Sequence, residues 1–407
     1  MSISSKYVPN SVTDAINLAH STPETTFGAP RNSPVRSRPL VPSINYSAAY
    51  SFANGDDLAS YHNSKYEGQR YCRDSNEIVQ QFERYIETTH GDLFKAVAFN
   101  SGMSAIAAVL ESMVEKNWQI WIPREVYRKA RELVFKLVGK IEGVTISEYD
   151  TISEITPQAS TPTLIWVETP SNPHLRIADY GRLAALKQQS ENVHIAVDLT
   201  FAGLLNFSFE YEYLDAIIHS CTKYVGGHND VVAGVALVKK DLFPSVWDRR
   251  SFAGGILDPT STYLLIRSLR TYDIRIKAQL QNTEKVLDFL ASHGEVTKVY
   301  YPGAFENEDQ KTIFDRHHTH GGAVVSFVIN KDPDDLMACV GLLLSTKMAP
   351  NFGSIDTQIE VPAIMSHFGK PEEYFEAIGL ERNLVRYSVG CEPIDNIIGD
   401  LKTLLAR

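Results

Sequence analysis

The segment from His219 to His228 combines a lysine with hydroxyl groups and a glycine pair, directly after the short apolar run Asp215-Ala216-Ile217-Ile218. The run has the length of a buried strand, and the glycines let the backbone pass close to a ligand. Lysine forms imines with carbonyl cofactors, and the hydroxyls of Ser220 and Thr222 can bind a phosphate. Lys223 is therefore our candidate for a covalent link to a carbonyl cofactor; the alternative is one surface lysine among many.

Three further apolar runs also end in polar groups. Phe99 to Ser104 leads into an expected helix from Ala105 to Lys116, whose first amide groups form an anion site. Ala196 to Thr200 carries a carboxylate, Asp198, which can pair with a protonated pyridine nitrogen. Val167 to Pro173 is another apolar strand that ends in polar residues. An anion site, an acid and a lysine at successive strand ends indicate one cofactor site.

From Ser75 to about Lys240, amphipathic helices alternate with short apolar strands. The order predicts an α/β fold with a mainly parallel, seven-stranded sheet covered on both faces, and ligands gathered at the carboxyl ends of the strands. The expected strands are Ala96 to Phe99, Gln119 to Ile122, Val144 to Tyr149, Leu164 to Glu168, His194 to Asp198, Ala216 to His219 and Val235 to Val238.

These segments resemble the Cys/Met-metabolism family of pyridoxal-5′-phosphate (PLP) enzymes, which holds cystathionine γ-synthase, cystathionine γ-lyase, cystathionine β-lyase, methionine γ-lyase and the O-acylhomoserine sulfhydrylases. The matching segments run from Pro42 to the C-terminus: Tyr71-Cys72-Arg73, Ser101-Gly102-Met103, Tyr127, Glu168 to Pro173, Asp198 with Thr200, Ser220 to Gly227, and Val385 to Gly390. The resemblance implies PLP as the cofactor and the PLP-dependent transferase fold of type I.

The resemblance also implies roles for single residues. Lys223 would hold PLP as a Schiff base and act as the general base, and Asp198 would keep the ring nitrogen protonated. Tyr127 would stack on the ring and serve as an acid or base, and Asn172 would bond the 3′-oxygen of the ring. The remaining implied cofactor contacts are Tyr71, Arg73, Ser101, Gly102, Met103, Thr200, Ser220 and Thr222. The implied substrate contacts are Arg386, Asn351 and Asn172, with Arg386 binding the α-carboxylate.

The first 70 residues are rich in Pro, Ser and Asn and predict an extended N-terminal arm over a partner surface. The resemblance implies that Tyr71 and Arg73 reach the PLP phosphate of an adjacent protomer, within a homotetramer built as a dimer of active dimers. We expect a large PLP-binding domain over residues 71–257 and a C-terminal domain over residues 258–407.

The C-terminal domain should be a smaller α/β unit. The pattern predicts one long helix from Ser261 to Ser292, strands from Ala323 to Ile329 and from Leu384 to Val389, and a closing helix that begins at Ile394. Arg386 falls on the expected central strand. A buried arginine there needs a carboxylate, and a structural salt bridge is the alternative to substrate binding.

Net charge, hydropathy and the distribution of Cys and His exclude several classes of partner and ligand. The 407 residues carry a net charge of −10, which disfavours nucleic acid or an anionic membrane as a partner. No signal-peptide pattern and no apolar run of membrane-spanning length occurs, so we expect a cytoplasmic protein. The scattered cysteines Cys72, Cys221, Cys339 and Cys391 predict reduced thiols, and His317-His318-Thr319-His320 predicts a solvated loop, so no metal is expected.

Departures from the family pattern shape the expected substrate. The usual Tyr-Gly-x-Thr is replaced by Tyr127-Arg128-Lys129-Ala130, which adds two positive charges near the cleft. Asn351 stands in place of a serine whose region contacts both the lysine and the substrate carboxylate, and Pro350 precedes it where cystathionine-handling members often carry Glu. Since Pro350 cannot pair with a distal ammonium, a substrate without one is favoured.

The sequence therefore predicts a PLP-dependent lyase or transferase that performs γ-elimination or γ-replacement on a γ-substituted L-α-amino acid without a distal amino group. Homoserine esters, methionine-like amino acids and γ-substituents with a non-sulfur leaving group such as halide all remain open. The alternatives are β-elimination of cysteine conjugates, a cystathionine synthase or lyase, a PLP aminotransferase, and a catalytically silent protein with the same fold.

Overall fold

A computed structural model of the chain describes residues 11–21, 40–66, 68–204, 206, 211–304 and 308–406. Its larger sheet has seven strands in the order β1-β7-β6-β5-β4-β2-β3. Strand β7 is antiparallel to both of its neighbours, and the other pairs are parallel. The strands are β1 (Phe94–Phe99), β2 (Gln119–Pro123), β3 (Thr145–Tyr149), β4 (Thr163–Glu168), β5 (Val193–Asp198), β6 (Ala216–Ser220) and β7 (Gly234–Lys239). The predicted seven-stranded, mainly parallel sheet is confirmed.

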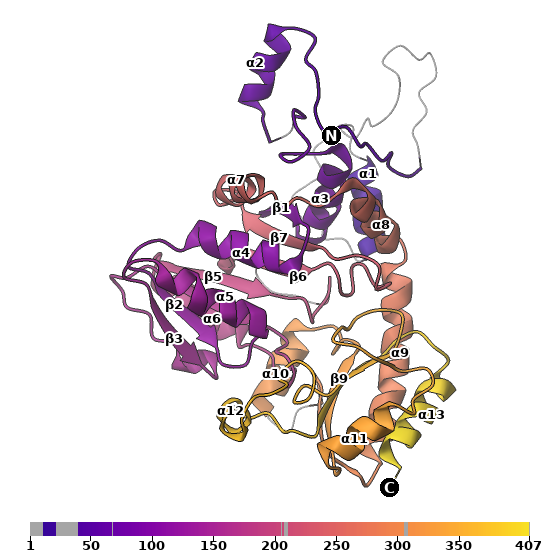
Figure 1. Cartoon of the computed structure of the whole chain (residues 1–407). Helices are drawn as coiled ribbons and strands as arrows, with labels where there is room; N and C mark the ends of the chain where they lie inside the picture. The colour runs from indigo at the N-terminus through magenta and orange to yellow at the C-terminus, as the bar shows by residue number, and fades with distance from the viewer. Residues whose placement is uncertain are drawn as a thin grey trace.

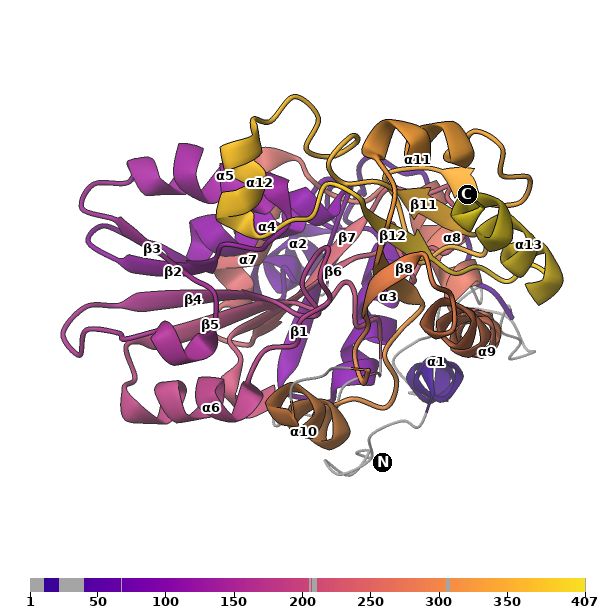
Figure 2. The ribbon, with the colours of Figure 1, turned by 90° about the horizontal axis from the view of Figure 1, so that it is seen from below.

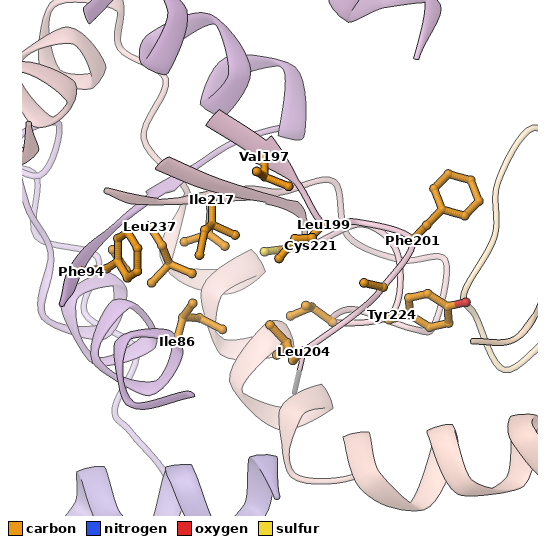
Figure 3. Close-up of a cluster of buried hydrophobic side chains, with 14 of the residues drawn as sticks. Ile86, Phe94, Val197, Leu199, Phe201, Leu204, Ile217, Cys221, Tyr224 and Leu237 are labelled. Carbon is orange, nitrogen blue, oxygen red and sulfur yellow. The ribbon is translucent and has the colours of Figure 1, made fainter. Parts of the chain in front are cut away.

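Helices cover both faces of this sheet because its strands are apolar on both sides. In β1, Ala96 and Ala98 pack into one core, whereas Val97 and Phe99 pack into another. The first core contains α3 (Glu77–His90), α6 (Tyr180–Gln189) and α8 (Pro259–Leu269), and the second contains α4 (Gly102–Met113), α5 (Arg128–Lys136) and α7 (Phe243–Ala253). Figure 2 shows α5 and α6 on opposite sides of the sheet. Figure 3 shows the first core continuing past Leu199 and Cys221 to Phe201 and Tyr224, the loops next to the candidate lysine.

A second sheet of five strands forms the C-terminal part of the chain, in the order β10-β11-β12-β9-β8. The strands are β8 (Val296–Tyr300), β9 (Val324–Ile329), β10 (Lys347–Met348), β11 (Gln358–Glu360) and β12 (Leu384–Ser388). The helices that follow β8 are α10 (Glu308–His317), α11 (Pro333–Val340), α12 (Glu372–Ile378) and α13 (Ile394–Leu405). The predicted strands and closing helix are confirmed, and β12, which carries Arg386, lies in the centre of the sheet.

The predicted single helix from Ser261 to Ser292 is wrong. The chain forms α8 and α9 (Tyr272–Ala291) instead, with a break at Arg270-Thr271. The Thr271 hydroxyl and the Arg275 guanidinium both donate to the Ser268 carbonyl, each at 3.1 Å. The Thr271 backbone N–H also donates to this carbonyl at 3.1 Å, so the last turn of α8 closes with a tighter bond three residues along and the two side-chain donors supplement it.

The N-terminal segment is less extended than its composition predicts. Residues 12–21 form α1 (Val12–Ser21), whose Val12 and Ile16 are buried against α3 and α9, and residues 55–63 form α2 (Gly55–Asn63). Figure 1 shows α2 on a segment that stands away from both sheets. Residues 1–10, 22–39 and 67 of the predicted arm lie outside the described residues.

The described ranges also contain three 3₁₀ helices, at Val138–Lys140, Ile152–Glu154 and Tyr211–Tyr213. All four cysteines are described and none is in a disulfide. Within the described ranges, no helix is both long and apolar enough to cross a membrane, and no group of three or more His, Cys, Asp or Glu side chains could hold a metal ion.

Candidate active site

A cavity of about 310 Å³ lies at the carboxyl ends of β4, β5 and β6, between the larger sheet and β12. Parallel strands place their carboxyl ends at one edge, so residues far apart in sequence meet there. Eleven of the residues predicted for the site line it: Ser101, Gly102, Met103, Tyr127, Asn172, Asp198, Thr200, Ser220, Thr222, Lys223 and Arg386.

Lys223 lies just beyond the end of β6, with its amine inside the cavity. Burial lowers its pKa to about 8, the nearby Arg386 cation adds to this effect, and the Glu360 carboxylate opposes it. The Nζ atom donates a short hydrogen bond to Oδ1 of Asn351 and lies 4.9 Å from the ring centroid of Phe352. A substantial fraction of the amine is therefore neutral and nucleophilic near physiological pH.

Asn351 is itself held by a second amide. Its Nδ2 donates to Oδ1 of Asn229 at 2.7 Å, and Asn229 donates to Asp356 at 2.8 Å. Because Asn229 accepts from the amino end of the Asn351 amide, the carbonyl end faces Lys223. Gly353 lets this loop approach, since it has φ of 77° and a Cβ there would lie 2.9 Å from the Tyr224 backbone nitrogen.

Asp198 ends β5 with its carboxylate buried in the cavity. Thr200 donates to Oδ1 of Asp198 from its backbone nitrogen at 2.9 Å and from its hydroxyl at 2.6 Å. The same hydroxyl accepts the Ser220 backbone N–H at 2.8 Å, which ties the end of β6 to the end of β5. Burial raises the pKa of Asp198, and the Thr200 hydrogen bonds oppose that rise.

Glu168 is a lining residue that our sequence analysis did not assign. It is the register partner of Asp198 on β4, and its Oε2 accepts the Tyr127 backbone N–H at 2.8 Å. Among the described residues, its buried Oε1 has no hydrogen-bond partner. Burial and the adjacent Asp198 charge raise the pKa of Glu168 well above its ordinary value. The sequence did contain a signal for this residue. Glu168 ends an apolar run, as Asp198 does, and neighbouring parallel strands end side by side.

The N-terminus of α4 and the end of β6 form an anion cradle. Ser101 is the N-cap, its hydroxyl accepting the Ser104 N–H at 3.1 Å, and Gly102 begins the helix. A Cβ on Gly102 would lie 3.0 Å from Cβ of Ser220, and one on Gly234 would lie 2.5 Å from the Ser101 carbonyl oxygen. These glycines let the helix N-terminus and the Ser220 hydroxyl converge on one point, as a bound phosphate requires.

Arg386 enters the cavity from β12. Its Nη1 donates to Oδ1 of Asn172 at 3.0 Å, its Nη2 donates to the Asn351 carbonyl at 3.3 Å, and Nη2 also forms a short ion pair with Glu360. The side chains of Arg386 and Glu360 are 5% and 3% exposed. The structural salt bridge considered from the sequence is thus present, and it coexists with a guanidinium that lines the cavity.

Aromatic side chains form a wall of the cavity that the sequence did not indicate. The rings of Phe201 and Phe352 stack with centroids 3.9 Å apart, and Cζ of Arg386 lies 5.4 Å from the Phe352 ring. Tyr127 lines the cavity and precedes α5. Its side chain is 43% exposed, which leaves room for a planar ligand beside it.

Tyr71 and Arg73 are not part of this cavity in their own chain. Tyr71 is 43% exposed and the Arg73 side chain 53% exposed, with the guanidinium 5.1 Å from the Tyr71 ring. Asn351 contacts Lys223 but does not line the cavity, whereas the adjacent Pro350 and Phe352 do.

The donor set fits the cofactor that the resemblance implies. A phosphate matches the amide groups at the α4 N-terminus beside Ser220, which makes no side-chain hydrogen bond within the described residues. A protonated ring nitrogen matches the Asp198 carboxylate, and a carbonyl matches the partly neutral Lys223 amine. One cavity therefore offers a partner for each polar group of PLP.

Comparison with known proteins agrees with this fit. Residues 27–406 match the family described as "Cys/Met metabolism PLP-dependent enzyme". The chain is 30% identical over 365 residues to cystathionine gamma-synthase 1 of Arabidopsis thaliana, covering 89% of this chain and 64% of that protein. It is 31% identical over 317 residues to L-methionine gamma-lyase of Fusobacterium nucleatum, covering 77% of this chain and 80% of that protein.

A solved structure shows the same fold. The crystal structure of cystathionine gamma-lyase from Lactobacillus plantarum with L-serine superposes with a TM-score of 0.78, at 29% identity, over 89% of this chain and 93% of the other.

Proposed function

The chain belongs to the family of Cys/Met metabolism PLP-dependent enzymes, and on this premise we propose that it catalyses γ-elimination or γ-replacement on a γ-substituted L-α-amino acid without a distal amino group. The observation that carries the proposal is the meeting of Lys223, Asp198 and Arg386 in one cavity. These side chains supply an amine, an acid and a carboxylate-binding group, the three functions that carbanion chemistry on an amino acid requires.

PLP, when bound, supplies an electron sink that stabilises negative charge at Cα of the substrate. Lys223 would hold the cofactor covalently, and its amine, when free, would take the proton from Cα of the substrate. Its lowered pKa supports this role, because a general base works best when its pKa lies near the working pH. Asp198, fixed by Thr200, would keep the pyridine nitrogen protonated.

Substrate orientation would come from three other side chains. Arg386 would bind the α-carboxylate, and Asn172, which accepts a hydrogen bond from Arg386, would bond the 3′-oxygen of the cofactor. Tyr127 would stack on the ring and exchange protons with the reacting group. For a γ-leaving group a second proton leaves Cβ, and we assign its transfer to Lys223 or Tyr127, two of the titratable groups that line the cavity.

The cavity supports a substrate without a second ammonium group. Pro350 lines the cavity at the position where cystathionine-handling members often carry Glu, and its side chain has no charge to pair with an ammonium.

An assay of keto acid and leaving group tests the proposed function. PLP-loaded protein is incubated with L-methionine, O-acetyl-L-homoserine, O-succinyl-L-homoserine, a γ-halogenated amino acid, L-cystathionine and L-cysteine, each with and without a thiol. Four-carbon keto acid, or a thioether when thiol is present, is the expected product. Pyruvate as the sole keto acid would reassign the protein to β-elimination.

Cystathionine synthesis or cleavage is the second candidate, because relatives at about 30% identity carry those names. The same panel separates the two candidates. Turnover of L-cystathionine, or its formation from L-cysteine and a homoserine ester, would favour this candidate over our interpretation of Pro350.

The assembly belongs to the proposal as well. We infer a homotetramer in which Tyr71 and Arg73 bind the phosphate of a neighbour's cofactor, supported by their exposure outside their own cavity and by the exposed apolar residues Leu40 and Tyr46 on the same segment. Light scattering of the PLP-loaded protein tests this, and a stable monomer with full cofactor affinity would contradict it.

The domain limits 71–257 and 258–407 and the cytoplasmic location stay predictions. Limited proteolysis tests the domain limits, and a fluorescent fusion tests the location.

A further inference from the structure

A second cavity of about 420 Å³ lies beside the candidate active site. Residues of α5 and α12 line it. Asn172 lines both cavities, and its Oδ1 accepts a hydrogen bond from Arg386. The two cavities therefore adjoin at Asn172, next to the Arg386 guanidinium.

Cationic side chains outnumber carboxylates in the lining of this cavity. Five cationic side chains line it, against three carboxylates, although the whole chain has a net charge of −10. The cations are Arg124, Arg128, Arg131, Lys136 and Lys370. A cavity with excess positive charge concentrates anions.

Buried His174 adds to this charge. Burial opposes its protonation, but hydrogen bonds to Glu125 at 2.8 Å and to Glu381 at 3.1 Å outweigh that effect and raise its pKa to about 9. The imidazolium neutralises the Glu125 carboxylate, one of the three acids of the cavity.

Two of the cations keep donors for a ligand. Among the described residues, Arg128 bonds through Nη1 alone, to Glu132, and Lys370 makes no ion pair. Lys370 lies 5.2 Å from the ring centroid of Tyr374, whose hydroxyl contacts Nδ1 of His367 at 3.0 Å. Burial lowers the pKa of His367, the Arg128 and Lys370 cations add to this effect, and the Glu360 carboxylate opposes it.

We propose that this basic cavity receives an anionic group, a carboxylate or phosphate, on the γ-substituent of the substrate, with Lys370 and Arg128 as its binding residues. The inference rests on the proposed function, because it assigns a substrate class to the same site. An acidic γ-substituent passes Asn172 and meets cations there, whereas a neutral one gains nothing from them. The basic residues thus select among homoserine esters that react by the same chemistry.

The experiment compares four esters of L-homoserine with the PLP-loaded protein. O-succinyl and O-phospho esters carry the anion, the O-acetyl ester carries none, and the methyl ester of the O-succinyl compound matches its length without the charge. We expect kcat/KM to be at least about fivefold higher for an acidic ester than for its neutral counterpart, the order expected of a partly screened charge contact. This preference should weaken as salt screens the cations. A higher kcat/KM for the O-succinyl ester identifies the preferred anion as a carboxylate, and a higher kcat/KM for the O-phospho ester identifies it as a phosphate.

Matched variants test the assignment to these residues. Lys370→Met removes a cation without stranding a carboxylate, and Arg128→Met leaves Glu132 paired with Lys129 and Lys136. Each should lower kcat/KM for the acidic ester to near the value for the neutral ester, with the neutral ester unchanged. Lys129→Met is the control, since Lys129 lies on the same helix but does not line the cavity.

Equal turnover of acidic and neutral esters by the native chain would overturn the inference, as would an equal effect of Lys129→Met and Lys370→Met. If none of the esters reacts, the proposed function fails, and calorimetric binding to Lys223→Ala protein decides the subsite by itself. Tighter binding of O-succinyl- than of O-acetyl-L-homoserine there would support the basic cavity, and equal binding would refute it.

Discussion

Arg386 on β12 is paired with the buried carboxylate of Glu360, its register neighbour on β11. Glu360 and Asn172 engage the two terminal nitrogens, and Nε has no partner within the described ranges. The guanidinium is therefore fixed in orientation before any substrate arrives. A substrate carboxylate would be the second anion bound to the Arg386 guanidinium. Its binding therefore depends on the N–H groups of Arg386 that Glu360 does not occupy.

Removing Glu360 tests the value of this pair. Glu360→Ala would leave the Arg386 charge buried and unpaired, so we expect the free energy of unfolding to fall by about 3–5 kcal/mol. Urea denaturation measures the change. The control is Glu372→Ala, because Glu372 pairs with Arg382 on the surface and both side chains are more than half exposed; that loss should stay below about 1 kcal/mol. Similar losses for the two variants would mean that the Glu360 pair is not structural.

The amine of Lys223 should titrate near pH 8 in cofactor-free protein, because burial disfavours its charged form. Its rate of reductive methylation, followed by mass spectrometry, should rise through about pH 8, whereas exposed lysines rise near about pH 10. Glu360→Gln should move the Lys223 midpoint to still lower pH, since Glu360 raises its pKa. A midpoint near that of exposed lysines would remove the physical basis for Lys223 as the base.

The Asn229–Asn351 contact should control how Lys223 is held. Asn229 has φ of 59°, so Asn229→Gly removes the side chain without backbone strain and frees the Asn351 amide to rotate. We expect kcat to fall about tenfold with KM little changed, a similar fall for Asn351→Ala, and no further fall in the double variant, because both changes act on Lys223 through the same Asn351 amide. Additive losses would show that the two amides act independently.

His174 should make stability depend on pH. Hydrogen bonds to Glu125 and Glu381 raise its folded pKa to about 9, above the ordinary value of about 6.5. This contribution is fully present below about pH 6.5 and is lost as the pH rises through about 9, an effect of about 3 kcal/mol. Unfolding free energies measured across this window should decline for the native chain and much less for His174→Gln. His62→Gln, on the exposed side of α2, is the control and should keep the native slope.

The sequence by itself determined the main architecture and the candidate cofactor site. Most strands of the larger sheet follow from short apolar runs, because a strand buried on both faces is apolar throughout; the edge strand β3 carries Glu148 and is half-buried. Lys223, Asp198 and the Ser101-Gly102 turn were found because each follows such a run directly. Since parallel strands end at one edge, these local signals were sufficient to bring the three together.

Only the tertiary structure decided which side chains meet across the sheet and between the two sheets. Glu360 joins Arg386 through the register of β11 with β12, and Glu168 joins Asp198 through that of β4 with β5. The break between α8 and α9 depends on Arg275, which also donates to the Tyr224 carbonyl, a group outside that helix pair. A periodic sequence pattern indicates that one segment is buried, but not which residues it packs against. These contacts, and the position of Asn172 in the lining of both cavities, therefore depend on tertiary packing.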